Sequence, residues 1–379
     1  MAKRAPLYCA TDKEIFDALV SSPQLFSELG LRGLAKERGI FYSPETSRPR
    51  LCGDISLLGF GFNEIARIQG EFEKTSRSEK KTFKYLKTEL SLEEFRSIAE
   101  QYKGEAEEEG EKVSWSNVGT TDFSLNVKYD EVDFSRTRLR QRQRREASLE
   151  FKVRNGETVL IYPSNEKANL IVETLIERAR AERSLQIAVE EVDLSPINNH
   201  ELRTKFFQEL MRGIPGFALE DVTHVQIDLK NQPELEDPEQ TDETVDEKRA
   251  VEEEIKGIVK DIALHGTSLH TSDEYKRLKD QGYFLTSVQW AARRKHSPFE
   301  VVQFDAGFND PVAGVGYRYG VRTWRLALET GQYAKSWTTI PSDDKRKLSS
   351  LLQQASMTVF MKIKKEFKDM AATATGEPL

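Results

Sequence analysis

Five arginines alternate with other residues between positions 136 and 144, in a segment that reads SRTRLRQRQRREASLEF. In a β-strand, alternate side chains point to the same face, about 6.5 to 7 Å apart. That spacing is close to the distance between successive phosphates along a nucleic-acid strand, and guanidinium groups bind phosphate through paired hydrogen bonds. The spacing therefore predicts a strand that binds nucleic acid through Arg136, Arg138, Arg140, Arg142 and Arg144.

Two other interpretations of the arginine segment stay open. Its residues are good helix formers, although such a helix would bury little besides Leu139. The arginines can also pair with acids of a neighbouring strand, and Asp130, Glu131 and Asp133 lie just upstream. A single strand through the whole segment would be unusually long, so we expect a bend or bulge near residues 145–147.

The same stretch contains a possible hydrolytic site. Glu150 and Lys152 share one strand face in SLEFKV, and Asp130 or Asp133 lies at the end of the preceding strand. A carboxylate followed on the next strand by Glu-x-Lys is the pattern of Mg²⁺-dependent restriction-type nucleases, in which carboxylates hold the metal. Because the chain is rich in Glu and Lys, catalysis is the second hypothesis, and no cofactor is expected unless it holds.

A second basic region occurs near the end of the chain. The segment GVGYRYGVRTWR places Arg318, Arg322 and Trp324 on one face of a predicted strand. Aromatic residues interleaved with arginine are typical of proteins that bind single-stranded nucleic acid, whereas burial of the aromatic residues in a core is the competing interpretation. We count Arg318 and Arg322 among the candidate nucleic-acid contacts.

Hydrophobic periodicity predicts the elements that carry these residues. Residues 1–110 read as a helical region and residues 111–232 as an α+β domain of antiparallel strands followed by a helix. Within that domain, Asn155 and Gly156 predict a hairpin turn. Residues 233–250 form an acidic linker. Residues 251–379 read as a mixed strand and helix domain that closes with a helix carrying an apolar stripe, so the predicted class is α+β.

A leucine and basic pattern between residues 31 and 55 surrounds a glycine stop and a small polar loop. The pattern consists of Leu31, Arg32, Leu34, Lys36, Arg38, Gly39, Ile40, Ser43, Leu51 and Ile55. It resembles the SAP, or helix-extended loop-helix, family of small DNA-binding modules. Ala35 stands where a leucine is usual, Pro44 replaces a loop glycine, and the loop is about two residues longer. The resemblance implies that this region docks on DNA, with phosphate contacts from Lys36, Arg38, Arg48 and Arg50.

Composition limits the partners. A net charge of -7 over 379 residues argues against a protein coated in basic surface. Residues 135–145 carry six arginines and no acid, so the rest of the chain sums to -13, and any polyanion binding must be local. The two cysteines, Cys9 and Cys52, exclude a disulfide framework and favour a reducing cytoplasm. No apolar run reaches the length of a membrane span.

These observations favour a non-catalytic cytoplasmic adaptor or regulatory subunit that binds DNA or RNA, such as those of prokaryotic DNA-handling or anti-phage defence systems. The Mg²⁺-dependent nuclease is one alternative. The other is a protein-interaction scaffold that assembles through the closing helix. Protein subunits and a homo-oligomer are compatible partners, and no membrane partner is expected.

Overall fold

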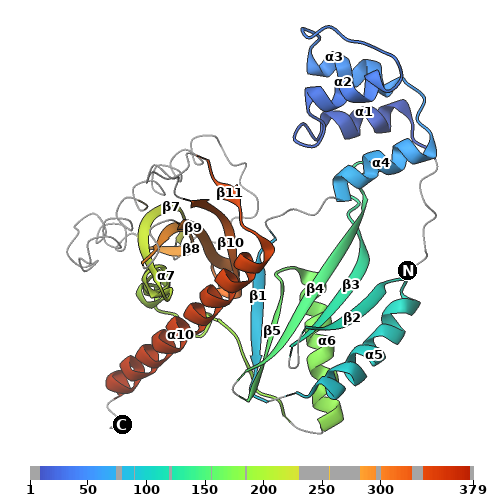
Figure 1. Ribbon diagram of the computed structural model, residues 1–379. Coiled ribbons are helices and arrows are strands. Elements are labelled where there is room, and N and C mark those ends of the chain that lie inside the picture. Colours follow the sequence, from blue (N-terminus) through green and yellow to red (C-terminus); the bar gives the residue numbers. More distant parts are fainter. Residues whose placement is uncertain are drawn as a thin grey trace. The chain divides into compact units, whose positions relative to one another are not determined.

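The structure is a computed structural model that describes residues 9–73, 79–88, 90–118, 122–154, 156–183, 186–229, 256, 282–295, 300–326 and 336–375 (Figure 1). These residues form eight helices and eleven strands, and the strand pairings are antiparallel, which confirms the predicted α+β class. The chain divides into two compact units that interleave in sequence. The first comprises residues 1–77, 90–153 and 167–186, and the second comprises residues 78–89, 154–166 and 187–379.

The first unit begins with four helices that share one core. They are α1 (Asp12–Val20), α2 (Glu28–Lys36), α3 (Arg48–Ser56) and α4 (Phe62–Glu73). A capping box starts α1, because the Thr11 hydroxyl accepts from the Glu14 N–H while the Glu14 carboxylate accepts from the Thr11 N–H. The core between these helices is apolar, with buried side chains that include Ile15, Leu19, Leu31, Leu51, Ile55 and Ile65.

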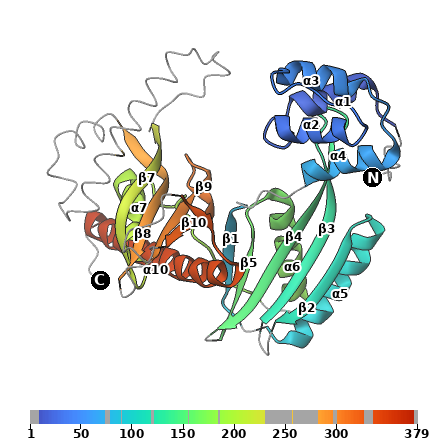
Figure 2. The same cartoon turned by 45° about the horizontal axis from the view of Figure 1, so that its top comes forward.

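Three strands of the eleven-stranded sheet, with two helices, complete the first unit. Its elements are α5 (Leu92–Glu108), β2 (Lys112–Val118), β3 (Asp122–Val132), β4 (Arg142–Arg154) and α6 (Glu166–Arg183). The strands alternate apolar and polar residues as predicted, and Phe123 of β3 lies directly opposite Phe151 of β4. Phe95 of α5 packs on both rings, with centroid distances of 5.8 and 4.8 Å. The apolar face of the sheet is therefore covered by helix, and α5 and α6 lie side by side (Figure 2).

The second unit contains the other eight strands of the eleven-stranded sheet, with helices packed on one face. Along the sheet the strand order is β5-β1-β10-β9-β8-β7, with β6 paired to β1 and β11 paired to β10. The elements are β1 (Lys81–Leu86), β5 (Glu157–Pro163), β6 (Val189–Glu190), α7 (His200–Gly213), β7 (Phe217–Leu229), β8 (Tyr283–Arg294), β9 (Glu300–Asp310), β10 (Val315–Leu326), β11 (Thr338–Thr339) and α10 (Ser342–Thr375). The core lies between this sheet and helices α7 and α10, and Trp290, Phe304 and Tyr319 are among its fully buried side chains.

The predicted helical character of residues 71–104 is wrong over KTFKYL, which forms β1 of the second unit. Phe83 and Tyr85 face the core while Thr82 and Lys84 point away, and β1 pairs with β5 and with β10. The units consequently do not follow the predicted domains, because the expected boundary at residue 110 lies inside the first unit. The predicted acidic linker, residues 233–250, lies outside the described residues.

Two other predicted features are present. Gly156, between β4 and β5, has a φ of +80°, the left-handed conformation that the predicted turn requires. The apolar stripe of the closing helix runs along α10, where Leu348, Leu352, Ala355, Val359 and Ile363 are all buried. This stripe packs on α7 and β10 inside the second unit (Figure 1). The predicted use of the stripe for oligomer assembly is therefore wrong, because the fold already covers it.

Candidate nucleic-acid interface

The arginine segment is a loop followed by a strand, so the predicted continuous row is wrong. Arg136, Arg138 and Arg140 lie in the turns that connect β3 to β4, and only Arg142 and Arg144 belong to β4. The pairing of β3 with β4 runs without interruption from Asp122 to Val132. The expected irregularity near residues 145–147 is consequently absent, and the chain reverses direction at residues 133–141 instead.

Burial of one leucine explains why the segment turns. Leu139 is 1% exposed and lies in the core of helices α1 to α4. The loop closes on itself around this side chain, since the Arg140 N–H donates to the Thr137 carbonyl at 2.7 Å and the Asp133 N–H to the Gln141 carbonyl at 2.8 Å. The end of the β3–β4 hairpin, residues 130–145, is thus anchored to the helical core. We call these residues the arginine hairpin end.

Acidic side chains pair with most of these arginines, as the second sequence interpretation anticipated. Five of the six arginines of the hairpin end lie within 4 Å of a carboxylate oxygen. The pairs are Arg136–Asp133 at 2.6 Å, Arg138–Glu14 at 3.0 Å, Arg144–Asp130 at 3.9 Å, Arg145–Glu131 at 2.9 Å, and Arg142–Asp130. Arg140 also contacts the helical region, because it donates to the hydroxyl of Ser21 at 3.2 Å.

These contacts hold the acids in their charged form. Hydrogen bonds from Ser135 and Arg136 lower the pKa of the Asp133 carboxyl. Partial burial raises the pKa of Glu14, but hydrogen bonds from Thr11 and Arg138 outweigh it, so the net shift is downward. Both carboxylates are therefore ionised at neutral pH and fix the positions of their arginines.

The hairpin end still carries an excess of positive charge. Residues 130–145 contain six arginines and three acids, a net charge of +3. A guanidinium group has five N–H donors, and one carboxylate engages at most two of them. Arg144 is the most exposed, with 69% of its side chain accessible, and its distance to Asp130 is the longest of the pairs. This surface can accept a further anion without breaking its own ion pairs.

Residues 31–55 form a helix end, an extended loop and a second helix. Helix α2 ends at Lys36, and the turn that follows it closes at a left-handed glycine, Gly39, with φ +74°. The Ile40 N–H donates to the Ala35 carbonyl at 3.0 Å, which is the bond of a Schellman stop. An extended loop follows, and α3 then buries Leu51 and Ile55. The helix, extended loop and helix are present, while kinship with the SAP family stays a prediction.

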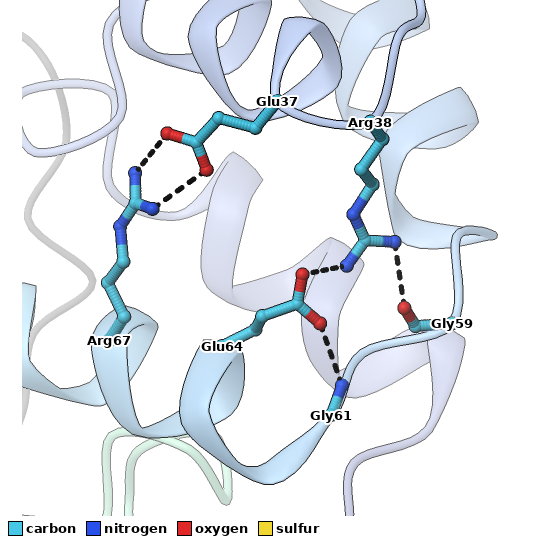
Figure 3. Close-up of polar contacts among 6 residues, drawn as sticks. All are labelled: Glu37, Arg38, Gly59, Gly61, Glu64 and Arg67. Atoms are coloured by element: carbon cyan, nitrogen blue, oxygen red, sulfur yellow. Dashed lines mark hydrogen bonds and ion pairs between the residues drawn. The ribbon is translucent and has the colours of Figure 1, made fainter.

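The basic residues of this region divide into structural and exposed groups. Arg38 donates to the Gly59 carbonyl at 2.7 Å and to Glu64 at 2.5 Å, which ties the end of α2 to α4 (Figure 3). Glu64 also accepts the Gly61 N–H at 2.8 Å, and a second bridge joins Arg67 to Glu37 through two hydrogen bonds. The hydrogen bonds of Arg38 therefore stabilise the fold, and its predicted phosphate contact is not supported.

Arg48 also has a structural role, because it donates to the Leu19 carbonyl at 2.7 Å and joins α3 to α1. Arg32, for which the sequence suggested no separate role, donates to carbonyls of the extended loop, including Pro44 at 2.9 Å. Lys36 and Arg50 are exposed, and the Nε of Arg50 lies 3.8 Å from the Asp54 carboxylate. Residues 9–73 contain seven Lys and Arg against ten Asp and Glu, so polyanion binding here depends on the arginine hairpin end.

The residues of the nuclease hypothesis do not come together. Glu150 lies opposite Ser124 on β3, whereas Asp130 is six residues further along that strand, a separation of about 20 Å. Asp133 follows Asp130 in the hairpin loop, further still from Glu150. Glu150 pairs with Lys152 at 2.9 Å. In the part of the chain that the structure describes, no cluster of three His, Cys, Asp or Glu side chains has the arrangement of a metal site.

Strand β10 of the second unit carries Arg318 and Arg322 on the face opposite to Tyr319, as the alternation predicted. A register shift between Val321 and Trp324 moves Trp324 to the core side, so its predicted place beside the arginines is wrong. Sequence reasoning missed the partner of Arg322, which is the fully buried Asp305 of β9 at 3.2 Å. A lone acid inside the apolar strand VVQFDAGF was the available signal, since a buried charge needs a partner.

Comparison with known proteins leaves function to be argued from geometry. No protein-family model matches the chain, and no curated protein sequence matches it. Among the described helices, none has the length and apolar character needed to cross a membrane.

Proposed function

We propose that this chain binds nucleic acid through the phosphate backbone at the arginine hairpin end, and that it acts as a cytoplasmic, non-catalytic adaptor or regulatory subunit. The observation that supports the proposal is the +3 charge of residues 130–145 on a loop that Leu139 anchors to the helical core. Because ion pairs already hold the arginines, little side-chain entropy is lost when a phosphate binds.

The binding mode follows from the N–H donors of the arginines that the ion pairs do not use. Arg138 and Arg144 each have one guanidinium nitrogen near a carboxylate, and their side chains are substantially exposed. Six arginines face four paired carboxylates, those of Asp130, Glu131, Asp133 and Glu14. The two uncompensated charges predict contact with about two phosphates, hence a salt slope of about -1.8 on duplex DNA. Contacts of this kind carry no base information, so we expect weak sequence preference.

A second candidate function rests on the same ion pairs. If the carboxylates neutralise the arginines completely, the arginine hairpin end has a structural role and holds the helical region against the strands. The chain is then an interaction scaffold. Five paired arginines favour this reading, whereas the net charge of +3 favours nucleic acid. The two candidates differ in affinity for polyanions.

Fluorescence anisotropy with duplex DNA, single-stranded DNA and RNA over a salt series separates them. Arg142→Gln with Arg144→Gln should weaken binding severalfold and bring the salt slope on duplex DNA close to zero. Arg293→Gln is the matched control, because Arg293 is an exposed arginine paired with Glu220 at 3.2 Å in the second unit. Unchanged affinity and slope in the double variant, or no binding by the unaltered chain, would overturn the proposal.

A further inference from the structure

A buried carboxylate in the second unit lies among three cations. Asp305 of β9 is 0% exposed, and Lys80, just before β1, places its Nζ 2.5 Å from one carboxylate oxygen. The Nε of Arg322 lies 3.2 Å from the other oxygen. Arg318 stands two residues before Gly320, and Gly320 is the residue directly opposite Asp305. By strand alternation, Arg318, Gly320, Arg322 and Asp305 all face away from the core.

One carboxylate cannot neutralise three cations, so the cluster carries an excess charge of +2. Burial lowers the pKa of Lys80, Asp305 raises it, and both Arg318 and Arg322 lower it further, which shows that the four charges act on one another. Arg318 forms no hydrogen bond or ion pair with the residues that the structure describes, and its Nε is shielded from solvent. The Arg318 side chain is half-buried, and an anion beside it would supply the acceptor that its shielded Nε lacks.

The backbone leaves room for that anion. A Cβ built on Gly320 would have no heavy atom within 4 Å, so the space over the sheet between Arg318 and Arg322 is open. Arg322 is 39% exposed, so a small ligand can reach the cluster from solvent. Arg322 pairs with Asp305 through its Nε, which leaves its terminal nitrogens for a ligand.

We infer that Lys80, Arg318 and Arg322 bind a phosphate group, and that Asp305 is a positioning residue that orients Lys80 and Arg322. Two guanidinium groups and one ammonium group can donate hydrogen bonds to phosphate oxygens. A phosphate monoester carries a charge of about -1.5 to -2 at pH 7, which matches the excess charge of the cluster. The phosphate can belong to a small phosphate ester or to a nucleic-acid end or backbone. The site does not depend on the arginine hairpin end, which belongs to the other unit.

Isothermal titration calorimetry of the full chain with inorganic phosphate, at constant ionic strength, tests this inference. The unaltered chain should show saturable binding, and Arg318→Gln should weaken it about tenfold, the effect of one lost charge-assisted contact. Arg293→Gln, an exposed arginine on β8, should bind phosphate like the unaltered chain. Absence of saturable binding, or equal weakening in both variants, would overturn the inference.

Two further arms complete the experiment. Arg318→Lys keeps the positive charge but loses the paired hydrogen bonds that a guanidinium group donates. Its affinity for phosphate should therefore lie between those of the unaltered chain and Arg318→Gln. Equal affinity in all three would also overturn the inference. Adenosine monophosphate and a single-stranded oligonucleotide without terminal phosphate distinguish the sources, because only the former offers a dianion. Persistence of phosphate binding in the Arg142→Gln, Arg144→Gln double variant would show that this site is separate from the proposed nucleic-acid interface.

Discussion

Truncation of Leu139 to alanine tests whether the arginine hairpin end is anchored as described. The side chain is 1% exposed and contacts the core of α1 to α4. Leucine to alanine changes in cores cost about 2 to 5 kcal/mol, and the smaller values occur where the surroundings collapse into the cavity. Because Leu139 comes from a loop that can shift, we expect a loss of about 2 to 3 kcal/mol in the free energy of unfolding of the helical core.

The assay must report on α1 to α4 directly. The four tryptophans of the chain are residues 115, 290, 324 and 337, so fluorescence does not report on residues 9–73. Amide hydrogen exchange read by mass spectrometry on peptides from residues 12–73 does. Val132→Ala is the matched control, because Val132 is exposed at the same hairpin end and should cost less than about 0.5 kcal/mol. Equal protection of α1 to α4 in the two variants would refute the anchoring of the loop by Leu139.

Three further predictions concern single charged residues. The lowered pKa of Glu14 stabilises the folded state above the ordinary value of 4.5, and this contribution is lost as pH falls through the lower folded pKa. Thermal unfolding between pH 7 and pH 3 should therefore depend less on pH in Glu14→Gln, and an unchanged profile would contradict this. Arg38→Gln should destabilise the helical core by about 1 to 3 kcal/mol because it removes two hydrogen bonds, whereas Lys36→Gln should change stability by less than about 0.5 kcal/mol. Urea unfolding measures both, and the reverse order would contradict the structural role of Arg38. Asp305→Asn should cost about 3 kcal/mol, since it removes a buried carboxylate from two partly shielded cations. Phosphate should raise its Tm less than that of the unaltered chain, because Lys80 and Arg322 lose the group that orients them. Equal Tm values without phosphate would contradict the pairing.

Local patterns predicted the elements whose structure depends on near neighbours. The alternation in β3 and β4, the turn at Gly156 and the stripe of α10 all follow from periodicity within a few residues. Strand β1 was not predictable in the same way. Its six residues, Lys81–Leu86, stand between helix-forming segments, and their strand conformation depends on pairing with β5 and with the much later β10. Tertiary pairing of this kind overrides local propensity.

The arginine segment shows how one apolar residue can decide between two structures. Alternating arginines fit a strand, and only the unusual length of that strand opposed the prediction. Burial of Leu139 among helices about a hundred residues earlier in the chain is worth more than the extension of an exposed strand pair. The candidate cations themselves were identifiable from sequence, but their partners were not. Glu14 for Arg138 and Asp305 for Arg322 come from distant segments that only the fold brings together.

The two basic features of the chain differ in how their charges are balanced, and this difference predicts different responses to salt. The acids of the hairpin end are exposed, so each ion pair is worth about 0 to 1 kcal/mol and exchanges readily with a phosphate. In the second unit, Asp305 is buried, and its cations are only partly accessible. Salt screens exposed charges more strongly than shielded ones. Rising salt should therefore abolish nucleic-acid binding at the arginine hairpin end while phosphate binding beside Gly320 persists, and loss of both at the same ionic strength would contradict the assignment of two distinct sites.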